Sequence, residues 1–310
     1  MRSASITTAD FVSGMCNLFA ASRTAIKELA QYTAILARML VDVEARVIRN
    51  TRLSSDYNVI ALAAPEIAAN TAPGQFVMVK SGRGRDPLLR RPFSVFEVLR
   101  SDGRIEGLSL LSKRVGITTG MLFDSVEGDV VSCLGPLGRP FEPIDPPGEA
   151  WLVAGGVGLA PFATLGDALI DRGTKTTLFY GARGGSELFY LDWFEKRGIR
   201  LVLATEDGSI GDRGRITVPL ERELQAASLS GLGSGIMIYA CGPEPMLEAV
   251  AHVAARFKRP SQVSVERVMG CGMGGCYSCV IPVRVAHTAH HYVRSCIAGP
   301  VFRGEDVVWD

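Results

Sequence analysis

The sequence predicts a multi-domain protein of the β plus α/β class, with an antiparallel β-barrel, a parallel-sheet α/β domain and a small C-terminal module. Its 310 residues correspond to about two domains of ordinary size. Near residue 148 the pattern changes from short β-rich runs to strands that alternate with helices. Four of the seven cysteines lie within the last forty residues, which sets that region apart from the rest.

The charge and hydropathy of the chain exclude several classes of function. Its 33 Lys and Arg residues nearly balance 32 Asp and Glu, and no long basic run occurs, so we expect no binding to nucleic acid or to an anionic membrane surface. No segment reaches about 18 consecutive apolar residues, so we expect no membrane span. The clustered cysteines are unlike a disulfide framework and indicate a reducing compartment, for which we expect a cytoplasmic location.

Residues 1–38 are rich in alanine and have a helical pattern, whereas strand-like runs begin only after Met39. We expect this segment to be an N-terminal extension that is helical or dispensable. The alternatives are a targeting peptide, or an upstream extension of the reading frame with true initiation at Met39.

Residues 41–145 are predicted to form the antiparallel barrel. Short β-rich runs separated by Gly, Pro, Asp and Asn are typical of such barrels. The expected strands are Val43–Asn50, Asn58–Ala64, Gln75–Lys80, Pro92–Leu99, Gly107–Leu111 and Asp129–Leu134.

Residues 148–260 are predicted to form the parallel-sheet domain, which follows a Pro-rich stretch. An apolar strand, a glycine turn and a helix open this region, and the alternation continues along the chain. The expected strands are Trp151–Ala154, Thr176–Tyr180, Arg200–Thr205 and Gly235–Ala240, and the expected helices are Pro161–Arg172, Leu188–Arg197 and Glu244–Phe257. Residues 261–310 form the cysteine module.

The cysteine module has a spacing that favours an iron–sulfur centre. Cys271, Cys276, Cys279 and Cys296 are separated by four, two and sixteen residues, the plant-type pattern of a 2Fe–2S cluster. The glycines between the first two cysteines allow positive φ angles and bring amide groups close to the sulfurs. Structural zinc and disulfides are the alternatives, although zinc sites more often use two separated Cys-x2-Cys pairs.

Three histidines, His287, His290 and His291, lie between the third and fourth of these cysteines. A Rieske centre would use two histidines in place of two cysteines. Because four cysteines already complete the coordination, we expect the histidines in a solvated loop.

A tetrapeptide in the barrel region fits a flavin. Arg91-Pro92-Phe93-Ser94 begins an expected strand, where arginine can pair with a pyrophosphate, serine can reach a flavin nitrogen and Phe93 can stack. Taken alone, the tetrapeptide is more typical of an ordinary edge strand.

Two motifs in the α/β region fit a dinucleotide. Gly155-Gly156-Val157-Gly158 follows an apolar strand and opens a helix, so its amides can bind a phosphate. It departs from the G-x-G-x-x-G fingerprint, so a tight packing turn is the alternative. Cys241 ends an apolar strand just before Gly-Pro, where it can touch a nicotinamide ring or simply fill the core.

Together and in this order, these motifs resemble the ferredoxin-reductase-like flavoproteins. The C-terminal module, which ends Arg294-Ser-Cys296-Ile-Ala-Gly-Pro-Val-Phe302, looks like that of the electron-transfer subunits of class 1B dihydroorotate dehydrogenases. The resemblance covers about residues 41–310. It implies a FAD-binding barrel, a NAD-binding domain and a 2Fe–2S module.

The resemblance also implies roles for single residues. In that family the Arg-Pro-x-Ser strand, the strand after it and a Gly-x-Gly-Thr turn hold FAD, and here Thr118 replaces the second glycine of the turn. FAD contacts are therefore expected at Arg91, Pro92, Phe93, Ser94, Leu111, Ser112, Lys113, Thr118 and Thr119. NAD(H) contacts are expected at Gly155, Gly156, Gly158 and Cys241, and cluster ligands at Cys271, Cys276, Cys279 and Cys296.

The implied function is electron transfer in pyrimidine biosynthesis. Electrons would pass between NAD(H) and an FMN-containing dihydroorotate dehydrogenase catalytic subunit, through FAD and the 2Fe–2S centre, within a heterotetramer. No catalytic acid or base is expected on this chain. The alternatives are a reductase subunit of a sulfur-reducing, hydrogenase or transhydrogenase complex, and a zinc-stabilised binding module without redox activity.

Overall fold

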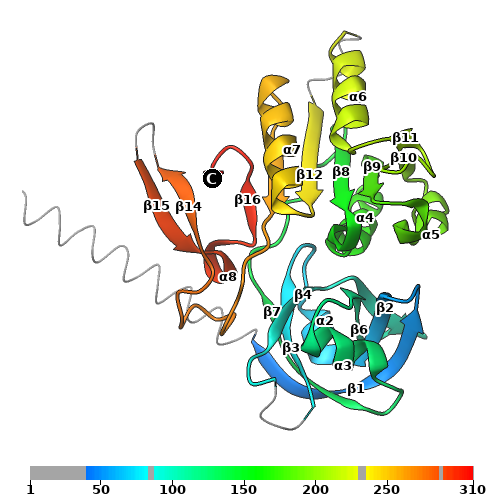
Figure 1. Cartoon of the computed structure of the whole chain (residues 1–310), viewed down its shortest axis with the longest axis vertical. Coiled ribbons are helices and arrows are strands. Elements are labelled where there is room, and N and C mark those ends of the chain that lie inside the picture. Colours follow the sequence, from blue (N-terminus) through cyan, green and yellow to red (C-terminus); the bar gives the residue numbers. More distant parts are fainter. Residues whose placement is uncertain (1–39, 83–86, 230–234, 286–288, 310) are drawn as a thin grey trace, which may run out of the picture. The chain divides into compact units, whose positions relative to one another are not determined.

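Two seven-stranded sheets and one hairpin make up the part of the chain that the computed structural model describes, residues 40–82, 87–229, 235–285 and 289–309 (Figure 1). The expected N-terminal extension, residues 1–38, lies outside these ranges. The antiparallel first sheet, the largely parallel second sheet and the separate C-terminal hairpin confirm the predicted fold class. In the described ranges, no helix has the length and apolar character needed to cross a membrane.

The first sheet is antiparallel, in the strand order β4-β3-β7-β1-β2-β6-β5. Its elements are β1 (Val41–Arg52), β2 (Tyr57–Ala63), β3 (Phe76–Ser81), β4 (Arg91–Ser94), β5 (Glu97–Ser101), β6 (Arg104–Lys113) and β7 (Val130–Leu137), with helices α2 (Pro65–Ala69) and α3 (Ile117–Asp124). The two helices are short insertions that the strand pattern did not predict.

A buried corner closes this sheet into a barrel. β4 and β5 follow one another in the chain but lie at opposite edges of the sheet. Between them, the amide of Val95 donates to the carbonyl of Gln75 (3.1 Å), and the amide of Phe96 donates to the carbonyl of Ser109 on β6 (2.8 Å). The run Pro92–Leu99, expected to be one strand, is therefore divided in two, because its two central buried residues bond to opposite edges.

The second sheet has the order β11-β10-β9-β8-β12-β13-β16 and is parallel except for its last strand. Its strands are β8 (Glu149–Gly155), β9 (Lys175–Ala182), β10 (Arg200–Thr205), β11 (Asp212–Arg213), β12 (Ile236–Cys241), β13 (Ser261–Ser264) and β16 (Val301–Arg303). Its helices are η1 (Gly156–Leu159), α4 (Pro161–Asp171), η2 (Gly185–Glu187), α5 (Leu191–Glu195), α6 (Thr217–Leu229) and α7 (Glu244–Arg256). The sheet continues past the boundary predicted at residue 260, because β13 pairs with β12 and β16 pairs with β13.

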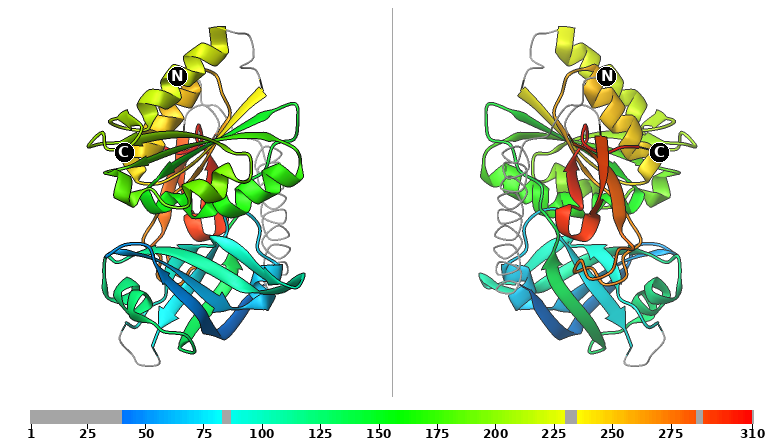
Figure 2. Two further views of the ribbon diagram at one scale, coloured as in Figure 1. Left: turned by 90° about the vertical axis from the view of Figure 1, so that its right-hand side faces the viewer. Right: turned by 90° about the vertical axis from the view of Figure 1, so that its left-hand side faces the viewer.

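Apolar residues alternate along β8 and supply two separate cores. Leu152 joins the core that includes the buried side of α4, and Val153 joins the core that includes α6 and α7. Figure 2 shows the green helix α4 and the yellow to orange α7 on opposite faces of this sheet. Helix α5 is shorter than the expected Leu188–Arg197, because Tyr190 at its N-cap is left-handed with φ +61°.

The C-terminal module consists of the hairpin β14 (Val280–Val285) and β15 (Ala289–Arg294), followed by α8 (Ser295–Ala298). Backbone hydrogen bonds attach it to the other two parts: Arg139 donates to Gly299 (2.6 Å) and Val265 donates to Pro300 (2.9 Å). His290 and His291 are exposed, as expected, but they lie on strand β15 of the hairpin and not in the loop that was expected, because each pairs with a residue of β14; His287 lies outside the described residues.

Candidate functional site

The four cysteines of the C-terminal module come together as two pairs. The amide of Cys276 donates to Cys271 Sγ (3.3 Å), and the amide of Met273 donates to the same sulfur (3.4 Å). Cys279 and Cys296 are both buried, and their thiols interact with each other. Among the described residues, no group of three or more His, Cys, Asp or Glu side chains surrounds a single point where a metal ion could sit. Two thiol pairs suit a centre with two irons better than one tetrahedral zinc ion.

The two pairs differ in their electrostatics. Hydrogen bonds from Ser278, and then from Cys271, lower the pKa of Cys276 to about 6. Burial, and then the neighbouring thiol of Cys279, raise the pKa of Cys296 to about 12. The pair Cys271 and Cys276 is half-buried and is better supplied with hydrogen-bond donors than the buried pair Cys279 and Cys296.

The loop of residues 270–279, which carries the first three cysteines and is called the cluster loop below, contains glycines that make close backbone approaches possible. Gly272 (φ +72°) and Gly274 (φ +79°) are both left-handed. A Cβ on Gly272 would collide with Met78 on β3, lying 2.8 Å from its Sδ. A Cβ on Gly274 would collide with Ile297 on α8, lying 2.8 Å from its Cγ1. The loop is thus packed between the barrel and the helix that carries the fourth cysteine.

Two neighbouring side chains fit a cluster in this loop. Arg294 donates to the carbonyl of Gly274 (2.5 Å) and stacks over the ring of Tyr277 (4.9 Å), so it fixes the loop from the hairpin side. Ser295, next to Cys296, is fully buried, and its hydroxyl has no hydrogen-bond partner among the described residues. A buried hydroxyl without a partner costs about 1–3 kcal/mol, and the sulfurs of a bound cluster would supply an acceptor.

The predicted flavin tetrapeptide forms strand β4, where Pro92 lies opposite Met78 of β3. Arg91 is exposed, and its Nη1 donates only to the carbonyls of Leu89 and Arg90 (both 3.1 Å), with no carboxylate partner among the described residues. Arg90, in contrast, pairs with Asp42 (2.7 Å). Arg91 is therefore the guanidinium available for a phosphate, and Phe93 and Ser94 beside it are half-buried.

The other residues expected to contact FAD have varied environments. Leu111 is part of a hydrophobic core, and Ser112 is buried with no partner for its hydroxyl in the described part of the chain. Thr118 is buried in α3, whereas the hydroxyl of Thr119 accepts the amide of Gly116 (2.9 Å) and so caps the same helix.

Lys113 connects the barrel to the second sheet. Its ammonium group lies 3.5 Å from Glu187 Oε1 in η2 and 4.8 Å from the ring centroid of Tyr57. The hydrogen bond with Tyr57 is the main reason that the pKa of Lys113 is raised. The ring of Tyr57 also packs on Phe189 (4.9 Å). The ammonium group of Lys113 therefore already has two partners within the protein, Glu187 and Tyr57.

The glycines of the nucleotide turn have two different roles. A Cβ on Gly158 would lie 2.5 Å from the carbonyl carbon of Cys241 and closer still to its oxygen, so Gly158 lets the turn pack against the end of β12. A Cβ on Gly155 would lie 2.7 Å from Met246 Sδ, so this glycine also allows close packing. Gly156 has φ +55°, and no heavy atom lies within 4 Å of the position of its Cβ. Gly156 is therefore the residue of this turn with an open face.

Cys241, at the end of β12, is paired with Ser264 of β13. Burial raises the pKa of its thiol to about 12, so the side chain is a neutral thiol at physiological pH. It belongs to the rim of the core that contains α4.

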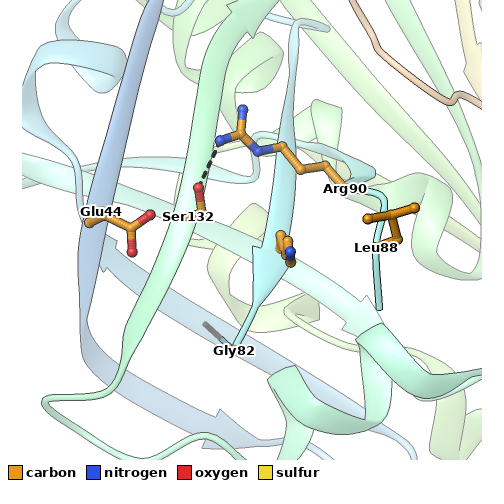
Figure 3. Close-up of a pocket in the computed structure, with 6 residues that line it drawn as sticks. Glu44, Gly82, Leu88, Arg90 and Ser132 are labelled. Atoms are coloured by element: carbon orange, nitrogen blue, oxygen red, sulfur yellow. Dashed lines mark hydrogen bonds between the residues drawn. The ribbon is translucent and has the colours of Figure 1, made fainter. Parts of the chain in front are cut away.

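Two surface grooves lie apart from these residues. One, of about 570 Å³, is on the outer face of the barrel, where the row Lys80, Ser132 and Glu44 crosses β3, β7 and β1 (Figure 3). The other, of about 620 Å³, surrounds α5. Neither contains a residue that the sequence predicted to bind a cofactor.

Sequence reasoning missed Met78 and Ser278. Met78 has no local signal, because only the fold brings β3 against the cluster loop. Ser278 stands between two predicted ligands, and its hydroxyl is 3.2 Å from Cys276 Sγ, so its position in the Cys-x2-Cys segment was the available signal.

Comparisons with known proteins assign the family. Residues 266–308 match the iron–sulfur cluster binding domain of dihydroorotate dehydrogenase B, and residues 152–252 match the oxidoreductase NAD-binding domain. The dihydroorotate dehydrogenase B (NAD(+)) electron transfer subunit of Desulforamulus reducens is 36% identical over 251 residues, covering 80% of this chain and 90% of the relative. That of Geobacillus kaustophilus is 40% identical over 240 residues, covering 76% and 86%.

The chain belongs to the family of dihydroorotate dehydrogenase B electron transfer subunits.

Solved structures place this electron transfer subunit among ferredoxin-reductase-like proteins. A structure described as the NADH-dependent reduced ferredoxin-NADP oxidoreductase, in work on flavin-based electron bifurcation, superimposes with a TM-score of 0.70 at 28% identity, covering 86% of this chain and 91% of the other. An Amycolatopsis cytochrome P450 reductase gives a TM-score of 0.58 at 28% identity, covering 71% and 67%. The two family models confirm the predicted iron–sulfur and NAD-binding parts of the chain, and the family implies a catalytic partner subunit.

Proposed function

We propose that this chain carries electrons between NAD(H) and the FMN-containing catalytic subunit of a dihydroorotate dehydrogenase, in pyrimidine biosynthesis. The observation that carries the proposal is the packing of the cluster loop: Gly272 contacts Met78, and Met78 lies opposite Pro92 of the flavin motif. The cluster loop and the flavin strand therefore share β3 as a neighbour. This adjacency supports direct passage of electrons between the two cofactors.

Three parts of the chain would each hold one cofactor. Arg91 would bind the diphosphate of FAD, with Pro92, Phe93, Ser94, Leu111, Ser112 and Thr118 around the flavin nucleotide. Gly156 would leave room for the dinucleotide phosphate, while Gly155 and Gly158 hold the turn against Cys241. Cys271, Cys276, Cys279 and Cys296 would ligate the cluster. When bound, FAD supplies the exchange between two-electron hydride chemistry and one-electron transfer.

The neutral thiol of Cys241 would give the nicotinamide an uncharged surface at the end of β12. Lys113 and Thr119 have partners within the protein, so we assign them to the domain contact and to the cap of α3. Hydride exchange between two cofactors needs no acid or base from the chain, and we assign none.

The face beside the cluster loop would receive the catalytic subunit. Val268, Met273 and Tyr277 are 83%, 47% and 70% exposed around the loop, although exposed apolar side chains are normally scattered. Apolar and aromatic residues gathered next to an electron-transfer group suit a protein partner. We propose a heterotetramer with two copies of each chain. The clustering of four cysteines near the C-terminus, unlike a disulfide framework, supports a reducing, cytoplasmic location.

The test is anaerobic affinity purification of the chain from its own cells. The expected result is co-purification of an FMN-containing subunit together with FAD, and a low-temperature electron paramagnetic resonance signal of a 2Fe–2S centre after reduction with NADH. A partner with several clusters, or a colourless zinc protein, would overturn the proposal.

A pair of variants tests the docking face. Tyr277→Glu should reduce the amount of catalytic subunit recovered, because it places a charge on the proposed interface. Leu229→Glu, at an equally exposed residue at the end of α6, should leave recovery unchanged. Equal recovery with both variants would contradict this choice of face.

A further inference from the structure

The hydroxyl of Ser278 connects the backbone at the start of the cluster loop to one of the cluster ligands. Its Oγ accepts a hydrogen bond from the amide of Gly270 (2.9 Å) and lies 3.2 Å from Cys276 Sγ. A Cβ on Gly270 would lie 3.1 Å from that sulfur, tighter than an ordinary contact, and 3.4 Å from the serine oxygen. The glycine therefore leaves the space in which the serine and the sulfur meet.

The direction of this hydrogen bond follows from the chemistry of the groups. A serine hydroxyl has one proton, and the amide of Gly270 already uses an oxygen lone pair as acceptor. When Cys276 ligates iron it is a thiolate without a proton, so it can only accept. The proton of Ser278 is then directed to the sulfur, and the Gly270 amide holds the hydroxyl in that orientation.

We infer that Ser278 raises the reduction potential of the cluster by donating a hydrogen bond to the ligand sulfur of Cys276. This inference rests on the proposed function, since it requires a 2Fe–2S centre on the four cysteines. Reduction adds one electron and one negative charge to the centre and breaks no bond. A donor aimed at a ligand sulfur stabilises the more negative state, and hydrogen bonds to sulfur are among the features that set cluster potentials.

Ser278 is the hydrogen-bond donor that a side-chain substitution can remove from the half-buried pair, Cys271 and Cys276. Cys271 accepts two backbone amides, from Met273 and Cys276, which side-chain substitution leaves in place. Ser278 is the side-chain hydroxyl that bonds to a ligand sulfur in the described part of the loop. It is a tuning residue, acting through Cys276, and it also lies on the exposed side of the loop, where the catalytic subunit is proposed to dock.

The test is a redox titration of the isolated holoprotein, followed by electron paramagnetic resonance. Ser278→Ala should shift the one-electron reduction equilibrium about tenfold toward the oxidised cluster, which equals a midpoint lower by about 59 mV. Ser278→Thr keeps the hydroxyl and should restore most of the wild-type midpoint. Tyr292→Phe removes an exposed hydroxyl from strand β15 of the same module, and should leave the midpoint unchanged.

A second measurement, on the wild-type protein, tests the inference even if the alanine variant does not retain its cluster. In D2O the iron–sulfur stretching bands in the resonance Raman spectrum should shift, because the hydroxyl proton bonded to the ligand sulfur exchanges. The shift should be smaller in Ser278→Ala or, if that variant binds no cluster, in Ser278→Val, which also lacks an exchangeable side-chain proton. An unchanged midpoint in Ser278→Ala, or an absence of any isotope shift in the wild type, overturns the inference. The lack of any 2Fe–2S signal in wild-type protein would instead overturn the proposed function.

Discussion

Two glycines of the nucleotide turn, Gly156 and Gly158, offer a test that separates contact with a ligand from packing within the protein. Gly158→Ala would place a methyl group 2.5 Å from the carbonyl carbon of Cys241 and 2.7 Å from Gly242 Cα. Ordinary contact begins at 3.4 Å, so one of the two backbone segments must move by at least about 0.9 Å to clear the carbonyl carbon, and by more to clear its oxygen. Because the obstacle is backbone on both sides, we expect the upper end of the usual cost of overpacking, about 3 kcal/mol.

Gly156→Ala is the matched control, two residues away in the same turn. Its methyl group would meet no heavy atom within 4 Å, so the cost is that of a left-handed alanine at φ +55°, about 1 kcal/mol. The same methyl group would occupy the open face where the dinucleotide phosphate is proposed to lie. We therefore expect NADH to bind at least about tenfold more weakly, which is about 1.4 kcal/mol.

Thermal unfolding and NADH titration by fluorescence measure the two effects on each purified variant. Gly158→Ala should lower the melting temperature by about 6 °C or more, whereas Gly156→Ala should lower it by only about 2–4 °C. The binding loss should be clear in Gly156→Ala even at a temperature where both proteins are folded. A wild-type melting temperature for Gly158→Ala, or wild-type NADH affinity for Gly156→Ala, would refute the division of roles.

Three other predictions concern Arg91, Lys113 and Glu244. Arg91→Ala should lower FAD affinity at least about tenfold, since its guanidinium is the one proposed to bind the diphosphate. Arg90→Ala is the control and should retain FAD. The flavin content of each variant after desalting measures both effects. Lys113→Met should keep its FAD, because the ammonium group forms an ion pair with Glu187. A double-mutant cycle with Glu187→Gln should give a coupling energy below about 1 kcal/mol, as is usual for a half-exposed ion pair. Loss of the flavin from Lys113→Met would show instead that Lys113 contacts FAD. The arginine partner of Glu244 lowers the pKa of that carboxyl, so its stabilisation is present above the unfolded pKa and is lost as pH falls through the lower folded pKa. Glu244→Gln should therefore melt about 1–2 °C below wild type at pH 7 and no lower than wild type at pH 2.5, and an equal difference at both pH values would contradict this.

Much of the fold was readable from contiguous residues. The apolar strand, glycine turn and helix around residue 155 gave the start of the second sheet, and α7 matches its expected range within one residue. The corner at Val95 and Phe96 was not readable, because its two amides bond to strands that come from different parts of the chain. Helix α6, with a weakly amphipathic sequence, was missed for want of a clear apolar stripe.

The candidate site divides in the same way. The spacing of the four cysteines was enough to predict a cluster, and the structure adds that the thiols form one half-buried and one buried pair. The tetrapeptide at Arg91 is weak evidence alone, and its FAD contacts stay a prediction; the structure adds that Arg90 has a carboxylate partner, whereas Arg91 has none among the described residues. The resemblance suggested Lys113 as a flavin contact, and the structure gives it a partner across the domain contact.

By itself, the sequence determined the class of fold, because strands and helices follow from local patterns of apolar residues and turns, and it predicted the cofactor types and the four cysteine ligands from motifs and their spacing. Only the tertiary structure decided that the cluster loop lies against β3, that Gly156 is open while Gly158 is packed, and that Ser278 points at a ligand sulfur. The first two depend on contacts between segments far apart in the chain. The third depends on how the loop folds back on itself, so that Gly270 holds the hydroxyl eight residues later in the chain.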